Sequence, residues 1–404
     1  MDQFLQVGGR FHIHWGSMSR VVRRLQPFAE TVFATMTAKA VEHKAVNLGQ
    51  GFPEEDGPRR MLEIAGEQIL AGNNQYSNGR GTAELRRAVA ADRERRYGIT
   101  YDPESEVLIT VGATEAITAS VLGLVEPGSE VIVLEPYYDV YAAAIALAGA
   151  TRVAVPLQLA GDTWELDVDL VAQAVTERTA MIIVNSPHNP TGSVFSREAL
   201  TQLAKLAIDR DLLVLTDEVY EHLVYDAEHV PLATLPGMRE RTITVSSAAK
   251  TFNVTGWKTG WALGAEELID AVIKAKQFIT FVGCTPVQPA VAYAIENEQP
   301  WIAEWHATMV RRRDELDRVL RECGFRVFDS RGTYFTVVDI ADITDQSGLE
   351  FCMSLPEIAG VAAIPVAGFT DHPDPWRSLV RFTYCKPDDQ LAEAERRLKA
   401  VFGA

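Results

Sequence analysis

The stretch Thr242-Ile243-Thr244-Val245-Ser246-Ser247-Ala248-Ala249-Lys250 decides how the rest of this sequence is interpreted. It begins as a β-branched, apolar run typical of a buried strand, and it ends in small residues followed by a lysine. A lysine amine in such a place can form a Schiff base with an aldehyde, and small neighbours leave room for a planar ring. A second lysine, Lys258, follows in Thr255-Gly256-Trp257-Lys258. The pattern predicts a site for an aldehyde cofactor at the carboxyl end of this strand.

A second predicted strand supplies what one such cofactor, pyridoxal phosphate (PLP), requires. The run Leu212 to Thr216 is apolar and ends in Asp217, with Tyr220 close behind. A carboxylate there can keep the pyridine nitrogen protonated, and the tyrosine can reach the ring hydroxyl oxygen. Considered alone, Asp217 would more often be the cap at the start of a loop. The functional interpretation of Asp217 therefore depends on the neighbouring predicted strand that leads to Lys250.

A third predicted strand, Glu106 to Val111, runs into Gly112-Ala113-Thr114-Glu115 and then a helix that is expected to end near Val125. A helix N-terminus presents free N–H groups to an anion, and glycine permits close approach. Glycine is common at strand–helix junctions, so this signal alone is weak. Together with Ser247 and Lys258 it predicts a site for the cofactor phosphate.

Two further loops follow predicted strands and offer contacts to a planar ring. After Met181 to Val184 comes Ser186-Pro187-His188-Asn189-Pro190-Thr191-Gly192, a rigid turn in which Asn189 can donate to a ring oxygen or a substrate carboxylate. After Val131 to Leu134 comes Tyr137-Tyr138, and either ring could stack on the cofactor. The alternatives are an ordinary turn and a pair of core aromatics.

Arg381 lies inside a strand-like run, Ser378 to Thr383, near the C-terminus. An arginine within a strand is costly to bury without a partner. Its planar guanidinium suits two-point binding of a substrate carboxylate. A salt bridge on an exposed sheet face is the equally weighted alternative.

Strand-like and helix-like segments alternate through the middle of the chain, including an amphipathic helix, Arg197 to Asp209, with Ser196 as its N-cap. This alternation predicts an α/β fold with a mainly parallel sheet that binds ligands at the carboxyl ends of its strands. No G-x-G-x-x-G follows a strand, which argues against a dinucleotide fold. The last third predicts a smaller α+β domain. Its expected elements are Trp301 to Cys323, Phe325 to Phe328, Thr333 to Ile340, Leu349 to Ile358 and Ser378 to Thr383.

The composition restricts the remaining choices. A formal net charge of -17 disfavours binding to nucleic acid or anionic membranes, and no apolar run is long enough to span a bilayer. The four cysteines are widely spaced and His12 with His14 has no further histidine near it, so no metal site is expected. Unpaired cysteines fit a cytoplasmic location. Met18 could be the natural start, and residues 1–17 are assigned no function.

From about Leu25 to Leu398 the chain resembles the class I/II aminotransferases of PLP fold type I, in particular the kynurenine/glutamine aminotransferase-like branch. Within that branch, residues 111–116, 186–192 and 217–224 are most similar to actinobacterial N-succinyldiaminopimelate aminotransferases. The resemblance implies a seven-stranded sheet, with residues 1–58 joining a small domain, 59–295 forming the large PLP domain and 296–404 the small domain. It rests on Asn47 to Pro53, Asn74 to Tyr76, Ser186 to Gly192, Thr216 to Tyr220 and Ser247 to Lys258.

The resemblance also implies roles for individual residues. Lys250 would hold PLP and later act as the base for proton transfer, while Asp217 pairs with the pyridine nitrogen. The ring would contact Tyr138, Tyr220 and Asn189. The phosphate would contact Gly112, Ala113, Thr114, Ser247, Lys258 and, in a homodimer with shared active sites, Tyr76 of the partner subunit. The substrate would contact Gly51, Asn189, Arg381, Phe33 and Phe281 of the partner subunit.

The implied reaction is ping-pong transamination between an amino acid and a 2-oxo acid, with N-succinyl-LL-2,6-diaminopimelate and 2-oxoglutarate, in lysine biosynthesis, as the first choice. Thr114 and Val282 stand where the kynurenine-type branch often has an aromatic residue and a histidine, which weakens a kynurenine preference. A broad-specificity kynurenine/glutamine/methionine-type aminotransferase and a PLP C–S β-lyase are the alternatives. A PLP-sensing regulator is disfavoured, because residues 1–24 are too short for a DNA-binding domain.

Overall fold

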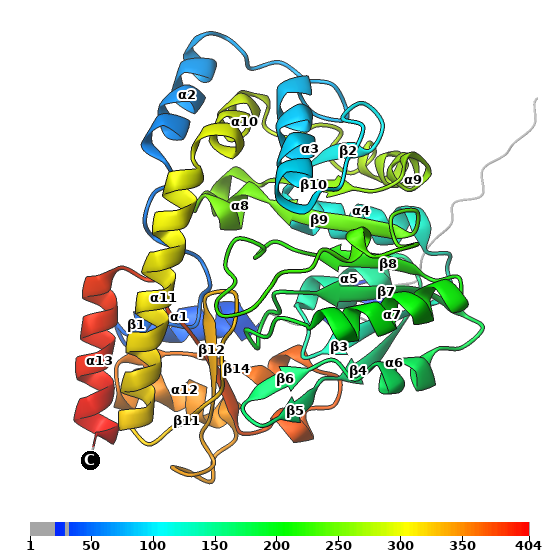
Figure 1. The fold of residues 1–404 in the computed structure, drawn as a ribbon. Helices are drawn as coiled ribbons and strands as arrows, with labels where there is room; N and C mark the ends of the chain where they lie inside the picture. Colours follow the sequence, from blue (N-terminus) through cyan, green and yellow to red (C-terminus); the bar gives the residue numbers. More distant parts are fainter. Residues whose placement is uncertain (1–20, 29–31, 404) are drawn as a thin grey trace, which may run out of the picture.

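A seven-stranded sheet lies at the centre of the structure, a computed structural model that describes residues 21–28 and 32–403 (Figure 1). Its strand order is β2-β10-β9-β8-β7-β3-β4, and every neighbouring pair is parallel except the two pairs that β10 makes. The predicted mainly parallel sheet is therefore confirmed. Its strands are β2 (Val107–Val111), β3 (Glu130–Glu135), β4 (Thr151–Pro156), β7 (Thr179–Asn185), β8 (Leu213–Asp217), β9 (Thr242–Ser247) and β10 (Thr259–Leu263).

Helices cover both faces of this sheet, which is why its strands are continuous apolar runs. The helices are α2 (Arg59–Leu70), α3 (Ala83–Tyr97), α4 (Gly112–Leu124), α5 (Asp139–Leu147), α6 (Val168–Ala174), α7 (Arg197–Asp209), α9 (Glu266–Lys276) and α10 (Gln288–Asn297). In β3, Val131 and Val133 pack with α4, α5 and α9, whereas Ile132 and Leu134 pack with α6 and α7. The apolar cluster that α2, α3 and α10 form covers the edge made by β2 and β10.

A second, antiparallel sheet has the strand order β11-β12-β15-β14, and its elements come mostly from the last third of the chain. They are β11 (Arg326–Val327), β12 (Phe335–Asp339), β14 (Ile364–Pro365) and β15 (Leu379–Thr383), with helices α11 (Gln299–Glu322), α12 (Gly348–Ile358) and α13 (Asp388–Phe402). The N-terminal residues join this unit, because β1 (Val46–Asn47) pairs with β13 (Val361–Ala362) and α1 (Val32–Glu42) packs on α12. The segment 32–50 thereby reaches the cavity wall, to which it contributes Phe33 and Gln50.

The sequence predicts only part of these elements. The helices α1, α2, α3, α6, α9, α10 and α13 and the strands β1, β13 and β14 are not among its predictions. The helix Arg197–Asp209 is confirmed, and the Ser196 hydroxyl accepts a hydrogen bond from the Ala199 N–H at 3.1 Å. The strands β4 and β10 and the hairpin of β5 (Gln158–Ala160) with β6 (Thr163–Glu165) were not predicted. The strand β10 was missed because it contains Gly260, and glycine is more typical of loops than of strands. The structure needs Gly260, because a Cβ there would lie 2.7 Å from the carbonyl carbon of Gly112.

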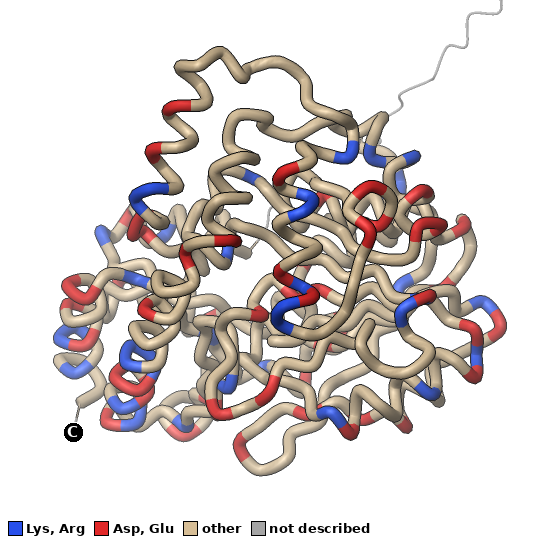
Figure 2. The backbone as a smooth tube through the Cα atoms, turned by 45° about the horizontal axis from the view of Figure 1, so that its top comes forward, with Lys and Arg blue, Asp and Glu red and all other residues tan. Residues whose placement is uncertain are grey.

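Charged residues gather on the outer helices rather than in the central sheet (Figure 2). Lysine, arginine and acidic residues alternate along α11 and α13, where Lys399 pairs with both Glu322 and Glu395. Within the part of the chain that the structure describes, no helix is both long and apolar enough to cross a membrane. His12, His14 and Met18 lie outside the described residues.

Candidate active site

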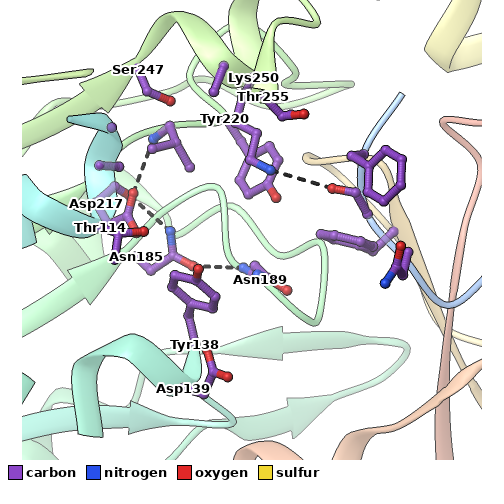
Figure 3. A pocket seen from close by; sticks show the side chains of 18 of the residues that line it. Thr114, Tyr138, Asp139, Asn185, Asn189, Asp217, Tyr220, Ser247, Lys250 and Thr255 are labelled. Carbon is purple, nitrogen blue, oxygen red and sulfur yellow. Dashed lines mark hydrogen bonds between the residues drawn. The ribbon is translucent and has the colours of Figure 1, made fainter. Parts of the chain in front are cut away.

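A cavity of about 340 Å³ opens where the carboxyl ends of β7, β8 and β9 meet the N-terminus of α4 (Figure 3). Its other wall comes from residues 50–52 and from β12 and β15 of the second sheet. This is the place that an α/β pattern predicts for a ligand. The predicted site residues that line it are Phe33, Gly51, Gly112, Ala113, Thr114, Tyr138, Asn189, Asp217, Tyr220, Ser247, Lys250, Lys258 and Arg381.

Lys250 lies in α8 (Ala248–Thr251), the single helical turn that follows β9. Its Nζ donates to the carbonyl oxygen of Gly51 at 3.4 Å and lies 5.9 Å from the centre of the Tyr220 ring. Burial lowers the pKa of Lys250 to about 8. A substantial fraction of this amine is therefore neutral near physiological pH, as a nucleophile or a general base requires.

Asp217 ends β8 and is 3% exposed. The Tyr141 hydroxyl donates to its Oδ2 at 2.7 Å, and the Val219 N–H donates to its Oδ1 at 3.3 Å. Burial raises the pKa of Asp217 to about 6, against the opposing effects of the Tyr141 hydrogen bond and the Lys250 charge. Among the described residues this carboxylate has no ion-pair partner within 4.0 Å. It therefore suits a ligand with a cationic ring nitrogen.

The N-terminus of α4 faces the cavity together with Lys258 and Ser247. Gly112 has φ 73°, and a Cβ there would lie 3.3 Å from Cε of Lys258. The backbone of Lys258 is itself left-handed, with φ 50°, which brings its side chain to the helix end. The first-turn N–H groups of a helix have no partner inside it, and an ammonium group beside them adds positive charge. The arrangement suits a phosphate group.

Arg381 is 1% exposed, which shows that the exposed-face alternative is wrong. Its guanidinium donates to Oδ1 of Asn189 at 2.8 Å and to the carbonyl oxygen of Gly49 at 2.9 Å, and it lies 3.9 Å from the centre of the Phe335 ring. Burial lowers the pKa of Arg381 to about 10. Its Nε has no hydrogen-bond partner, and no carboxylate within the described residues pairs with it. A buried guanidinium held only by neutral groups suits a substrate carboxylate.

The structure separates the two tyrosines that follow β3. The Tyr137 hydroxyl donates to Asp371 at 2.7 Å, and this residue does not line the cavity. Tyr138 does line it, with its ring edge-on to Tyr141 at 5.8 Å between centres. Tyr138 is therefore the aromatic residue in position to cover a planar ring.

Tyr76 and Phe281 do not line the cavity of their own chain. They are 81% and 47% exposed, and their rings contact each other edge-on at 5.5 Å. Phe278, on the same loop as Phe281, is 86% exposed. All three are large apolar side chains exposed at the surface, and two of them are in contact.

Three residues at the site were not predicted from the sequence. Asn185 donates to the Asp217 carbonyl oxygen at 2.8 Å and accepts from the Asn189 N–H at 2.8 Å. Its place directly after an apolar strand is a signal that could have identified it. Tyr141 could have been found from its spacing of one helical turn from Tyr138. Tyr334, whose hydroxyl donates to the Gly51 carbonyl oxygen at 2.6 Å, gives no such signal because its partner is far away in sequence.

The donor set fits PLP on the observations above. An amine with a lowered pKa, a buried carboxylate without a cationic partner, and a helix N-terminus beside a lysine line one cavity. These groups match the aldehyde, the pyridine nitrogen and the phosphate, respectively. Glycine at position 112 lets the Lys258 side chain lie directly beside the helix end, and glycine at position 260 lets β10 pack closely against Gly112.

Comparisons with known proteins agree with this chemistry. Residues 43–398 match the family described as aminotransferase class I and II. The chain is 55% identical over 389 residues to the "probable N-succinyldiaminopimelate aminotransferase DapC" of Mycobacterium tuberculosis, covering 94% of this chain and 98% of the relative. It is 36% identical to the methionine aminotransferase of Escherichia coli, over 94% and 97% of the two chains. The solved structure of N-succinyldiaminopimelate aminotransferase from Mycobacterium tuberculosis superimposes with a TM-score of 0.93, at 56% identity, over 94% of this chain and 100% of that one.

Proposed function

Because the chain belongs to the class I and II aminotransferases, which use pyridoxal phosphate, we propose that it transfers the amino group of N-succinyl-LL-2,6-diaminopimelate to 2-oxoglutarate. The relatives in Mycobacterium tuberculosis support the choice of donor. The observation that carries the proposal is one cavity shared by Lys250, Asp217 and Arg381, none of which forms an ion pair with another described residue. A family member with this donor would act in lysine biosynthesis.

The phosphate of PLP would bind at the N-terminus of α4, with Gly112, Ala113, Thr114, Ser247 and Lys258 around it. The carboxylate of Asp217 would accept a hydrogen bond from the protonated pyridine nitrogen and so keep it protonated, and Tyr220 and Asn189 would contact the ring oxygen. When bound, PLP supplies an electron-withdrawing ring that stabilises negative charge on the substrate Cα. Tyr138 would cover the ring.

The protein's own residues then have separate tasks in the transfer. Arg381, with Asn189 and the backbone at Gly51, would bind the α-carboxylate that every amino donor and 2-oxo acceptor carries. This contact orients the Cα–H bond. The neutral amine of Lys250 would remove the proton from the substrate Cα and, as the ammonium, would return a proton on the other side of the transferred nitrogen. Tyr141, bonded to Oδ2, would keep the Asp217 carboxylate fixed during both half-reactions.

We further propose that the active unit is a homodimer with shared sites. Tyr76 and Phe281 are exposed and in contact, so one surface could supply both to the cavity of the partner. Phe33 would line the same side-chain pocket from within the chain. The proposal includes the division into residues 1–58, 59–295 and 296–404, which the two sheets support, and a cytoplasmic location, which the four unpaired cysteines support.

The test is the absorbance spectrum of the purified PLP enzyme after addition of N-succinyl-LL-2,6-diaminopimelate alone. We expect the aldehyde form of the cofactor to convert to the amine form, because donor chemistry needs no acceptor. No change with this donor, while glutamine or kynurenine converts the cofactor, would replace the proposal by a broad-specificity aminotransferase. Release of pyruvate and ammonia from a cysteine conjugate, without an acceptor, would favour the β-lyase.

A further inference from the structure

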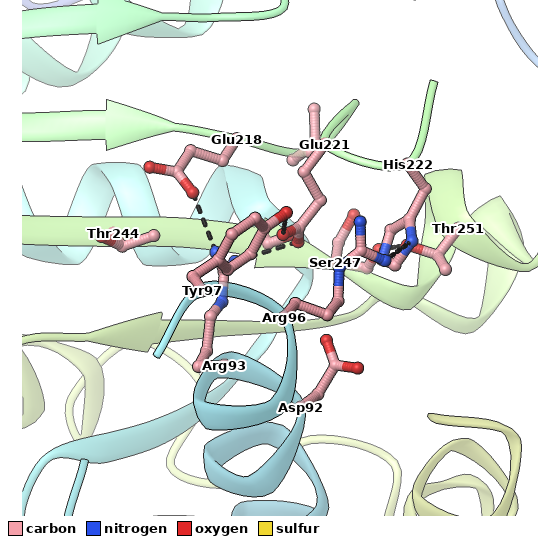
Figure 4. Close-up of polar contacts among 12 residues, drawn as sticks. Asp92, Arg93, Arg96, Tyr97, Glu218, Glu221, His222, Thr244, Ser247 and Thr251 are labelled. Atoms are coloured by element: carbon pink, nitrogen blue, oxygen red, sulfur yellow. Dashed lines mark hydrogen bonds and ion pairs between the residues drawn. The ribbon is translucent and has the colours of Figure 1, made fainter. Parts of the chain in front are cut away.

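A buried polar cluster lies behind the cavity, on the side of β8 and β9 that faces α3 (Figure 4). Its centre is Arg93 of α3, which donates to Oε2 of Glu218 and to Oε1 of Glu221, each at 2.9 Å. All three side chains are at most 3% exposed. We call these residues, together with Tyr97, His229 and Ser246, the Arg93 cluster.

The Arg93 cluster ties together the two strand ends that carry the site. Glu218 directly follows Asp217, and Glu221 directly follows Tyr220. Glu221 also accepts from the Ser246 hydroxyl at 2.7 Å, and Ser246 directly precedes Ser247 on β9. The turn after β8 and the end of β9 are therefore both fixed to α3 through one pair of carboxylates.

The charges of the cluster are paired within it. Burial alone would lower the pKa of Arg93, and the carboxylates of Glu221 and Glu218 outweigh this effect and raise it. The pKa of Glu221 falls to about 2, although burial opposes the fall, mainly because of Arg93. Glu218, Glu221 and His229 could bring three ligand atoms within 4.8 Å of one another. Arg93 already donates to both carboxylates, so we assign no metal to this place.

We propose that Arg93 is a positioning residue for the reaction: its single positive charge, shared between Glu218 and Glu221, offsets part of the buried negative charge behind Asp217, and so it keeps Asp217 in its charged form. The inference rests on the proposed role of Asp217 toward the pyridine nitrogen. Arg93 does not line the cavity, so it acts only through its neighbours.

The groups that face Asp217 give the direction of the effect. Tyr141 and Tyr138 face it from α5 and the residue before α5, Lys250 from α8, and Glu218 and Tyr220 from its own turn. Among them Glu218 is the group whose charge raises the pKa of Asp217, and Lys250 and the Tyr141 hydrogen bond lower it. Without Arg93 the negative charge of Glu218 acts on Asp217 without compensation. Without Glu218 that charge is absent.

The two ends of one salt bridge therefore have opposite effects, which a merely structural bridge would not have. The probe is pyridoxamine 5′-phosphate, which does not react with Lys250, titrated into cofactor-free enzyme from pH 5 to 8 and followed by tryptophan fluorescence. The phosphate of the probe takes up a proton near pH 6 in every variant, so the break assigned to Asp217 is measured as the difference from that shared pH dependence. In the parent, affinity should weaken further below a break near pH 6, where Asp217 becomes protonated. We expect Glu218→Gln to move this break down by about one pH unit, and Arg93→Met to move it up by a similar amount.

Two controls make the outcome specific. Arg86 lies two turns earlier on α3, is 4% exposed and pairs with Glu104, so Arg86→Met repeats the loss of a buried arginine without touching the cluster. It should leave the break in place. Arg93→Lys keeps the charge but not the two-armed geometry, so it should weaken affinity by a similar factor at every pH.

The outcomes distinguish this inference from the proposed function. If Asp217→Asn leaves the break unchanged, the proposed role of Asp217 is wrong. If Asp217→Asn removes the break but Glu218→Gln and Arg93→Met both leave it in place, or move it in the same direction, the inference about Arg93 is overturned. If Arg93→Met fails to fold, the test is Glu218→Gln alone: a downward move of its break supports the inference, and an unchanged break overturns it.

Discussion

The cavity and the Arg93 cluster lie on opposite sides of the same two strand ends. Buried charges are paired within the protein in the cluster and lack such partners in the cavity. In the cluster, Arg93 is held between Glu218 and Glu221, and no charge depends on a ligand. In the cavity, Lys250 and Asp217 have pKa values shifted by burial to about 8 and about 6. Buried charges without a protein partner destabilise the fold, and they are retained where a ligand supplies the partner. This difference in charge pairing identifies the cavity as the side that binds a ligand and the Arg93 cluster as the side that holds the strand ends in place.

The largest effect is expected from Lys250→Ala, which removes the amine proposed to be both nucleophile and base. We expect kcat to fall by roughly 10³-fold or more in the transamination assay, since general-base catalysis and cofactor attachment are lost together. Lys205→Ala, which removes an exposed lysine on α7, is the control and should change nothing. Full activity in the Lys250 variant would remove the basis for placing the chemistry in this cavity.

Arg381→Lys should have the next largest effect, because it keeps the positive charge and removes the planar fork. We expect kcat/KM to fall by roughly 10²-fold for donor and acceptor alike, since both carry the carboxylate that this residue would bind. Steady-state kinetics with each substrate varied in turn gives the two values. A loss confined to one substrate would contradict a shared carboxylate site.

The comparison between cavity and cluster is tested most directly by the stability of the cofactor-free protein. The folded pKa of Asp217, about 6, is above its ordinary value of 3.8, so its charge opposes folding above pH 6 and has no effect below about pH 4. Asp217→Asn should therefore raise the free energy of unfolding at pH 7 by about 3 kcal/mol, with the gain lost as the pH falls from 6 to 4. Denaturant unfolding at several pH values measures this.

Glu221→Gln should do the reverse. The pKa of Glu221 is lowered to about 2, so its charge stabilises the fold above its ordinary pKa of 4.5 and that contribution is lost as the pH falls toward 2. Removing it leaves Arg93 half-paired, and we expect a loss of about 3 kcal/mol at pH 7. Changes of the same sign in both variants would show that buried charge has the same effect on stability in the cavity and in the Arg93 cluster.

The sequence was sufficient to predict the cavity side and insufficient to predict the cluster. Lys250, Asp217 and Gly112 each follow an apolar strand, and parallel strands end at one edge, so their meeting can be predicted from order alone. Arg93 lies on a helix that the sequence reading did not identify. Its partners are 125 and 128 residues away, with no local pattern to connect them. The glycine-containing strand β10 was missed because its place is fixed by close packing against Gly112.

The smallest effect concerns a third side of the cavity, which a partner subunit would complete. Tyr76 is 81% exposed in this chain, so its hydroxyl should contribute little to folding stability. Tyr76→Phe should therefore leave the stability of a single chain unchanged. If it donates to the cofactor phosphate across a dimer, its loss should weaken PLP affinity by roughly tenfold, the usual value of one hydrogen bond to a charged group. Titration of PLP into the cofactor-free enzyme measures the change, and Tyr293→Phe on α10 is the control. Equal PLP affinity in the Tyr76 variant and the parent would mean that the phosphate is bound by residues of one chain, without Tyr76 of the partner subunit.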